Sequence, residues 1–251
     1  MAGHPRSPGT GNPLEGIDLV VFDKDGTLIE FQAMWGGWVR ALARDLERET
    51  GAALTKPLYQ VLGVDQDTGL VRSHGLLAAT PMSRIREVVV AVVRDHVGGA
   101  SSARRAEAAV ERTWHPPDPV TLAEPVGDLR HLLAELRRTG RRIAVATSDD
   151  RAPTRRTFAG LGVADLIDEL ACADDGEAVK PAPAAVLRLC ANLGIEPAST
   201  AVVGDSTADL SMGRAAGVRR VIGVLTGVGD RATLEPLADL VLGSITELLP
   251  A

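Results

Sequence analysis

The chain has 251 residues, of which 45% are hydrophobic and 24% are charged, with a net charge of −6. This composition is close to that of an average globular protein and excludes a wholly disordered chain. The acidic balance and the lack of a dense Lys/Arg block argue against nucleic acid as the main partner. An anionic small molecule needs only local positive charge and stays compatible with this sequence.

The N-terminus and the cysteines bear on location. Residues 1–13 are rich in Gly, Pro and Ser and lack the apolar stretch of a secretory signal, which indicates a disordered tail. No apolar run reaches the roughly 18 residues that a membrane span needs. Cys172 and Cys190 have no metal-binding spacing and are expected to be reduced, buried thiols. We expect a cytoplasmic monomer or homodimer with no membrane partner.

Short apolar runs that end at polar residues recur along the chain and are typical of buried parallel strands. They cover residues 17–22, 142–146, 200–203, 221–225 and, more weakly, 239–242. Helical spacing of apolar residues lies between them, at residues 126–139, 183–192 and 208–216. Strands that alternate with helices predict an α/β fold with a doubly wound parallel sheet.

Residues 31–120 interrupt this alternation with two apolar stripes of helical period. The stripes are formed by Trp35, Trp38, Val39, Leu42 and Leu46, and by Ile85, Val88, Val89, Val92 and Val93. A Pro-rich segment at 115–119 then reads as a linker. We expect a small helical domain over 31–120, inserted after the first strand of an α/β core that comprises residues 14–30 and 121–251.

Polar side chains follow three of the predicted strands, at the edge where open α/β sheets bind ligands. They are Asp23 and Asp25, Thr147 and Ser148, and Asp205 with Asp209, while Lys180 lies in the loop that enters a neighbouring helix. Carboxylates this close repel each other unless a cation or a proton intervenes, and four of them suit Mg²⁺. The hydroxyls and the lysine supply the donors and positive charge that a phosphoryl group needs.

Four segments, in this order, resemble the motifs of the haloacid dehalogenase-like (HAD) superfamily. They are Phe22–Leu28, Ala146–Ser148, Val179–Pro183 and Gly204–Asp209. The resemblance spans residues 14–250. The insert after the first motif is similar to the helical cap of the branch that contains phosphoglycolate phosphatase and β-phosphoglucomutase.

The resemblance implies a role for each acid of the first motif. Asp23 would be the nucleophile that forms an aspartyl phosphate. Asp25 would protonate the leaving oxygen and then act as the base for water. The dehalogenases of the superfamily lack an aspartate at the position of Asp25, so phosphoryl transfer is implied. At Lys24 many members carry an apolar residue, and we expect its side chain to point toward the insert or the solvent, or to contact substrate.

The remaining motif residues would hold the metal and the phosphate. Mg²⁺ would be bound by Asp23, by the backbone carbonyl of Asp25, by Asp205 and, directly or through water, by Asp209. Thr147, Ser148 and Lys180 would bind the substrate phosphate. The implied function is a Mg²⁺-dependent phosphatase that acts on a small phosphorylated metabolite, with a phosphoglycolate-like phosphomonoester as the first candidate.

Other interpretations stay open at this point. A phosphomutase would use the same nucleophile and return the phosphate to a sugar, and a non-catalytic binding protein could keep the fold. Thr147 and Ser148 could instead cap a helix, Lys180 could lie on a surface loop, and Asp209 could be a first-turn acid favoured by the helix dipole. In the insert, the following could be core or solvated residues or could contact substrate: Trp35, Trp38, Arg72, His74, Arg84 and Arg86.

Overall fold

A computed structural model describes residues 12–71, 75–80, 82–99, 101–117, 123–176 and 180–249. The chain forms two compact units. One contains the described residues up to Ile29 and from Pro125 onward, and the other is Glu30–Glu124. Most of the predicted tail lies outside the described residues.

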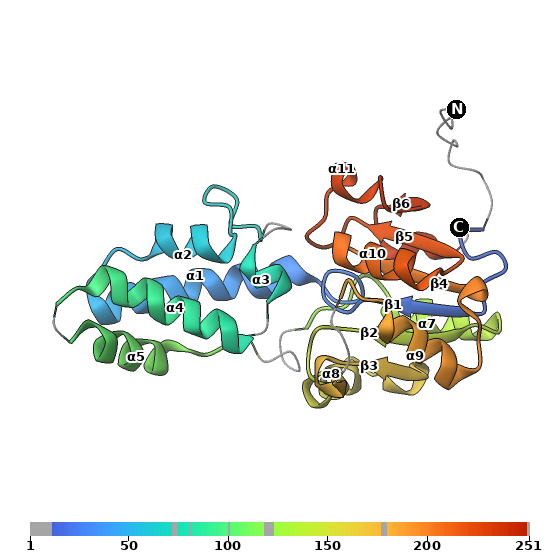
Figure 1. The fold of residues 1–251 in the computed structure, drawn as a ribbon, viewed down its shortest axis with the longest axis horizontal. Coiled ribbons are helices and arrows are strands. Elements are labelled where there is room, and N and C mark those ends of the chain that lie inside the picture. Colours follow the sequence, from blue (N-terminus) through green and yellow to red (C-terminus); the bar gives the residue numbers. More distant parts are fainter. Residues whose placement is uncertain are drawn as a thin grey trace. The chain divides into compact units, whose positions relative to one another are not determined.

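The first unit contains a six-stranded parallel sheet in the order β3-β2-β1-β4-β5-β6 (Figure 1). Its strands are β1 (Leu19–Phe22), β2 (Arg142–Ala146), β3 (Glu169–Ala171), β4 (Thr200–Gly204), β5 (Arg220–Val224) and β6 (Leu240–Leu242). The predicted parallel α/β sheet is confirmed. Strand β3 escapes prediction because its three residues begin with Glu169 and are too few to show a pattern.

Helices connect these strands and bury the sheet. They are α7 (Leu129–Arg138), α8 (Arg151–Gly160), α9 (Ala184–Leu193), α10 (Thr207–Ala216) and α11 (Arg231–Leu234), with short 3₁₀ turns at Ala164–Leu166, Ala173–Asp175, Pro197–Ser199 and Ile245–Leu248. Leu19 and Val21 belong to a core cluster with residues of α9 and α10. Val20 and Phe22 point to the opposite face by strand alternation and are equally inaccessible to solvent. The central strand is therefore covered on both faces.

The second unit is helical. Its helices are α1 (Phe31–Thr50), α2 (Thr55–Leu62), α3 (Leu76–Ala79), α4 (Met82–Val97) and α5 (Ser102–Thr113). The predicted stripe of α4 is buried through Ile85, Val89 and Val93. Among the described helices, none has the length and apolarity needed to cross a bilayer.

The aromatic and basic candidates of this unit are mostly structural where they are described. Trp38 is buried and packs edge-to-face against Trp35 and Trp114, with ring centroids 5.8 and 5.2 Å away. Arg84 pairs with Glu87 of its own helix. Arg86 likewise pairs with Glu111, whereas Arg72 and His74 lie outside the described residues. Trp38 is thus a core residue, and both described arginines lie in solvated ion pairs.

Candidate active site

The central strands bring the motif residues to one edge of the sheet. Strand β1 pairs on one side with β2 and on the other with β4, so that Phe22 lies opposite Val145 and Val203. Asp23 follows β1 directly, and its backbone N–H donates to the Val203 carbonyl oxygen at 2.9 Å. Asp205 comes directly after β4. The convergence expected from parallel strand ends is therefore present.

A tight turn follows the first two acids. The backbone N–H groups of Leu28 and Ile29 both donate to the Lys24 carbonyl oxygen, at 2.9 and 3.0 Å. Gly26 has φ +89°, and a Cβ at this position would lie 2.6 Å from Asp205 Oδ2. Only glycine satisfies both the backbone conformation and this close approach.

Lys180 joins two of the acids. Its Nζ lies 2.5 Å from Asp23 Oδ1 and 2.6 Å from Asp209 Oδ1, and its side chain is only 11% exposed. Burial lowers the pKa of Lys180, but Asp209 and Asp23 outweigh this and raise it above its usual value. Lys180 is therefore a buried cation at the sheet edge, and the surface-loop alternative is wrong.

Asp209 caps the start of its own helix and also contacts Lys180. Its Oδ2 accepts from the Ser206 backbone N–H at 3.1 Å, and its own backbone N–H donates to Ser206 Oγ at 3.3 Å, so that the two residues form a capping box at the start of α10. Its Oδ1 accepts from Lys180. The interpretation as a first-turn acid is correct, and the same side chain also fixes Lys180 beside Asp23.

Three carboxylates form a group with the chemistry of a cation site. Asp23, Asp205 and Asp209 each offer an oxygen, and these atoms lie within 4.8 Å of one another. Burial, only partly offset by Lys180, raises the pKa of Asp23 to about 7. Burial and the charges of Asp23 and Asp209 raise the pKa of Asp205 well above its ordinary value. Gathered oxygen donors that repel each other fit a hard divalent cation such as Mg²⁺.

The loop after β5 also shapes this site, although the sequence motifs did not indicate it. The Val228 N–H donates to Asp205 Oδ2 at 2.7 Å, and Thr226 Oγ1 donates to the Gly26 carbonyl oxygen at 2.6 Å. A Cβ at Gly227 would overlap the Asp205 side chain. The glycines that follow the last long strand were the available signal, since they mark a close backbone approach.

The second motif forms a loop before α8. Thr147 is buried, and its Oγ1 accepts from the Asp149 backbone N–H at 3.1 Å, whereas Ser148 is exposed. Helix α8 begins only at Arg151 and has Asp150 at its N-cap position. The helix-cap alternative for Thr147 and Ser148 is therefore wrong.

An ion-pair network anchors the far side of this loop. Arg151 Nη2 donates to Asp175 Oδ2 at 2.8 Å and to the Leu170 carbonyl oxygen at 2.9 Å. Arg188 of α9 donates to the same Asp175 oxygen at 2.6 Å. The start of α8 is thus tied to Leu170 of β3 and to Asp175, which α9 also contacts.

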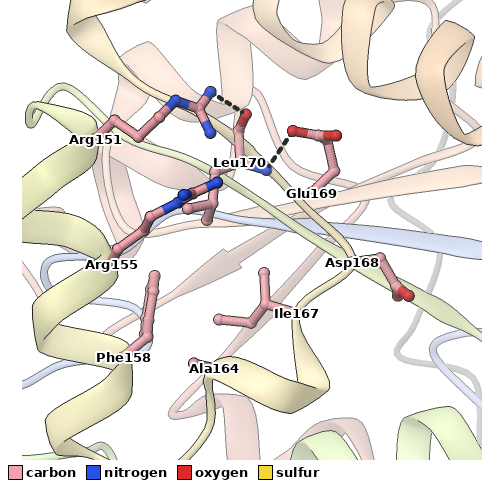
Figure 2. Close-up of a pocket in the computed structure, with 8 residues that line it drawn as sticks. All are labelled: Arg151, Arg155, Phe158, Ala164, Ile167, Asp168, Glu169 and Leu170. Atoms are coloured by element: carbon pink, nitrogen blue, oxygen red, sulfur yellow. Dashed lines mark hydrogen bonds between the residues drawn. The ribbon is translucent and has the colours of Figure 1, made fainter.

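A cavity of about 350 Å³ lies beside strand β3 and helix α8. Figure 2 shows the side chains that line it. Its lining consists of Arg151, Arg155, Phe158, Ala164, Ile167, Asp168, Glu169 and Leu170. Asp168 and Arg151 are both occupied by ion pairs within the protein. None of the motif residues lines this cavity, so we do not place the chemistry there.

The expectation that Lys24 could point toward the solvent is wrong. The side chain is only 1% exposed, and its Nζ lies 2.5 Å from Asp25 Oδ2 and 3.0 Å from Asp149 Oδ2. Burial lowers the pKa of Lys24, but Asp25 and Asp149 more than compensate and raise it. Lys24 is therefore a second buried cation at this edge of the sheet.

Comparisons with known proteins identify the family of this chain. The model of the family "haloacid dehalogenase-like hydrolase" matches residues 17–217. The chain is 30% identical over 203 residues to phosphoglycolate phosphatase of Rhodospirillum rubrum, which covers 81% of this chain and 78% of that protein. It is 27% identical to validoxylamine A 7'-phosphate phosphatase of Streptomyces hygroscopicus subsp. limoneus, covering 92% of this chain and 95% of that protein.

The fold is shared with solved structures. A HAD family hydrolase from Deinococcus radiodurans superposes with a TM-score of 0.63 at 22% identity, covering 95% of this chain and 94% of that one. The family model covers most of the chain and includes all four motif segments, with Lys180 in the third. The chain therefore belongs to the haloacid dehalogenase-like hydrolase family.

Proposed function

We propose that this hydrolase is a Mg²⁺-dependent phosphatase that cleaves a small phosphomonoester through an aspartyl-phosphate intermediate on Asp23. The observation that carries the proposal is the placement of Lys180 between Asp23 and Asp209, 2.5 and 2.6 Å from their oxygens. A buried ammonium beside a carboxylate nucleophile supplies the positive charge that an incoming phosphoryl group needs.

Asp23 and Asp25 divide the chemistry between them. An Asp23 carboxylate oxygen attacks phosphorus, the bond to the leaving oxygen breaks, and Asp25 gives that oxygen its proton. Asp25 then takes a proton from water, which attacks the aspartyl phosphate and releases inorganic phosphate. Asp23 is regenerated as a carboxylate, and Asp25 is protonated again for the next cycle.

The phosphate is held by residues of the other motifs. Lys180 neutralises the charge on the transferring group, while Thr147 and the Ser148 backbone N–H donate hydrogen bonds to its oxygens. Asp23, the Asp25 carbonyl oxygen and Asp205 would hold Mg²⁺, with Asp209 nearby. When bound, the ion neutralises charge on the phosphate oxygens.

The substrate class follows from the relatives and the two-unit organisation. The Rhodospirillum rubrum relative is named phosphoglycolate phosphatase, so we propose phosphoglycolate or a similarly small phosphomonoester. Because all four motifs lie outside residues 31–120, we propose that this insert selects the substrate. Ranking phosphorylated metabolites by kcat/KM tests the class. Phosphate transfer to a hexose 1-phosphate in place of release would contradict the phosphatase assignment.

The metal site is tested by the Asp205→Asn variant. A neutral amide is a poorer ligand for a hard cation, so the Mg²⁺ concentration for half-maximal hydrolysis of an aryl phosphate should rise. We expect a rise of at least about tenfold, since loss of an outer partner alone costs about 10–100-fold in metal affinity. Asp239→Asn is a matched control, because Asp239 is an ion-paired aspartate at the opposite end of the sheet. An unchanged Mg²⁺ titration for Asp205→Asn would contradict the assignment.

A further inference from the structure

Lys24 lies in the sequence between Asp23 and Asp25, and its side chain is buried. Its side chain is 1% exposed, and its ammonium lies between Asp25 Oδ2, at 2.5 Å, and Asp149 Oδ2, at 3.0 Å. Lys180 contacts a different pair, Asp23 and Asp209. The two buried lysines therefore serve separate acids, and the proposed phosphate chemistry uses only Lys180.

The Asp25 carboxyl group is held asymmetrically. Its Oδ2 receives the Lys24 ammonium, while its Oδ1 is buried and has no hydrogen-bond partner among the described residues. An ammonium group only donates, so the oxygen that faces it accepts and does not carry the acid proton. The proton of the acid form consequently belongs on Oδ1.

Asp149 anchors the lysine from the second-motif loop. Its backbone carbonyl oxygen accepts from the Ala173 N–H at 2.9 Å, and its N–H is bound by Thr147 Oγ1. These two backbone hydrogen bonds hold Asp149 in place, and its side-chain carboxylate contacts Lys24. Asp149, Lys24 and Asp25 form one connected chain of charges that links two neighbouring strand ends, and we call it the Lys24 chain.

We infer that Lys24 is a positioning residue that, anchored by Asp149, fixes the Asp25 carboxyl so that Oδ1 faces the reacting group as proton donor and acceptor. This inference rests on the proposed function, since it needs Asp25 to act as the acid and base. Misplacement of a catalytic group by about 1 Å can cost about 10²-fold in rate. Lys24 then affects the steps that need the proton and leaves attack by Asp23 largely intact.

The Lys24→Met variant tests this with two esters of similar shape, nitrophenyl phosphate and phenyl phosphate. Nitrophenol leaves without much protonation, whereas phenol needs the acid. We therefore compare kcat/KM for nitrophenyl phosphate with kcat/KM for phenyl phosphate. The ratio of the first to the second should rise about tenfold in Lys24→Met, which is less than the roughly 10²–10⁴-fold that a general acid contributes in full. Lys56→Met, at an exposed lysine of α2, should leave the ratio unchanged.

A role confined to folding or to general packing would lower kcat/KM for both esters equally, and an unchanged ratio in Lys24→Met would overturn the inference. Adding Lys24→Met to Asp25→Asn should change the ratio no further, because Lys24 acts through Asp25. An additive effect would also overturn it.

If Lys24→Met fails to fold, Asp149→Asn supplies the same test, with the ratio expected to rise and an unchanged ratio contradicting the inference. A wild-type protein that hydrolyses neither ester would overturn the proposed function itself.

Discussion

Replacing Asp23 by Asn should abolish phosphatase activity. The amide keeps the size of the side chain but cannot attack phosphorus, so no covalent intermediate forms. Loss of a covalent nucleophile lowers kcat by a factor on the order of 10⁶ in a well-studied protease, and we expect activity to fall to the level of a background reaction. Steady-state hydrolysis of an aryl phosphate measures the effect.

The matched control for Asp23→Asn is Asp18→Asn, an exposed aspartate just before the same strand. It should retain wild-type kcat. Residual activity in purified Asp23→Asn within about tenfold of wild type would contradict nucleophilic catalysis, since even general acid–base groups contribute about 10²–10⁴-fold.

Replacing Lys180 by Met should cost about 10²–10³-fold in kcat, the range for removal of one group that stabilises developing charge. The methionine keeps the apolar stem and removes the ammonium that separates Asp23 from Asp209. The two carboxylates are then left together without a cation, which disfavours binding of an anionic phosphate.

Kinetics with an aryl phosphate and inorganic phosphate as inhibitor measure both effects in Lys180→Met. Phosphate inhibition should weaken along with kcat. The Lys56→Met protein is the control for loss of a lysine. A Lys180→Met enzyme with unchanged kcat would contradict the role given to this ammonium.

The fold could be predicted because its strands have a strong local signal. Apolar runs that end at polar residues identify β1, β2, β4 and β5, and their parallel arrangement brings their carboxyl ends together. Membership of the hydrolase family, expected from the four motifs, is confirmed. Strand β3 has only three residues and depends on pairing with β2 rather than on its own pattern.

The sequence predicts which residues lie at the sheet edge better than it predicts which of their side chains contact each other. The sequence shows Lys24 next to two acids, but its partner Asp149 is 125 residues away and reaches it only because β1 and β2 are neighbours. The contact of Val228 with Asp205 likewise depends on a loop after β5. Such contacts depend on tertiary geometry, which no local spacing records.

The most direct test of the account is the location of phosphate in the Asp25→Asn protein. The nitrophenol group of nitrophenyl phosphate needs little protonation to leave, so Asp23 should still be phosphorylated by this ester, whereas hydrolysis of the aspartyl phosphate lacks its base. The intermediate should therefore accumulate in a rapid-quench experiment, and mass spectrometry should find phosphate on the peptide that contains Asp23. Asp23→Asn should show none. Phosphate on another residue, or equal trapping by both variants, would contradict the assignment of Asp23 as the nucleophile and Asp25 as the acid and base.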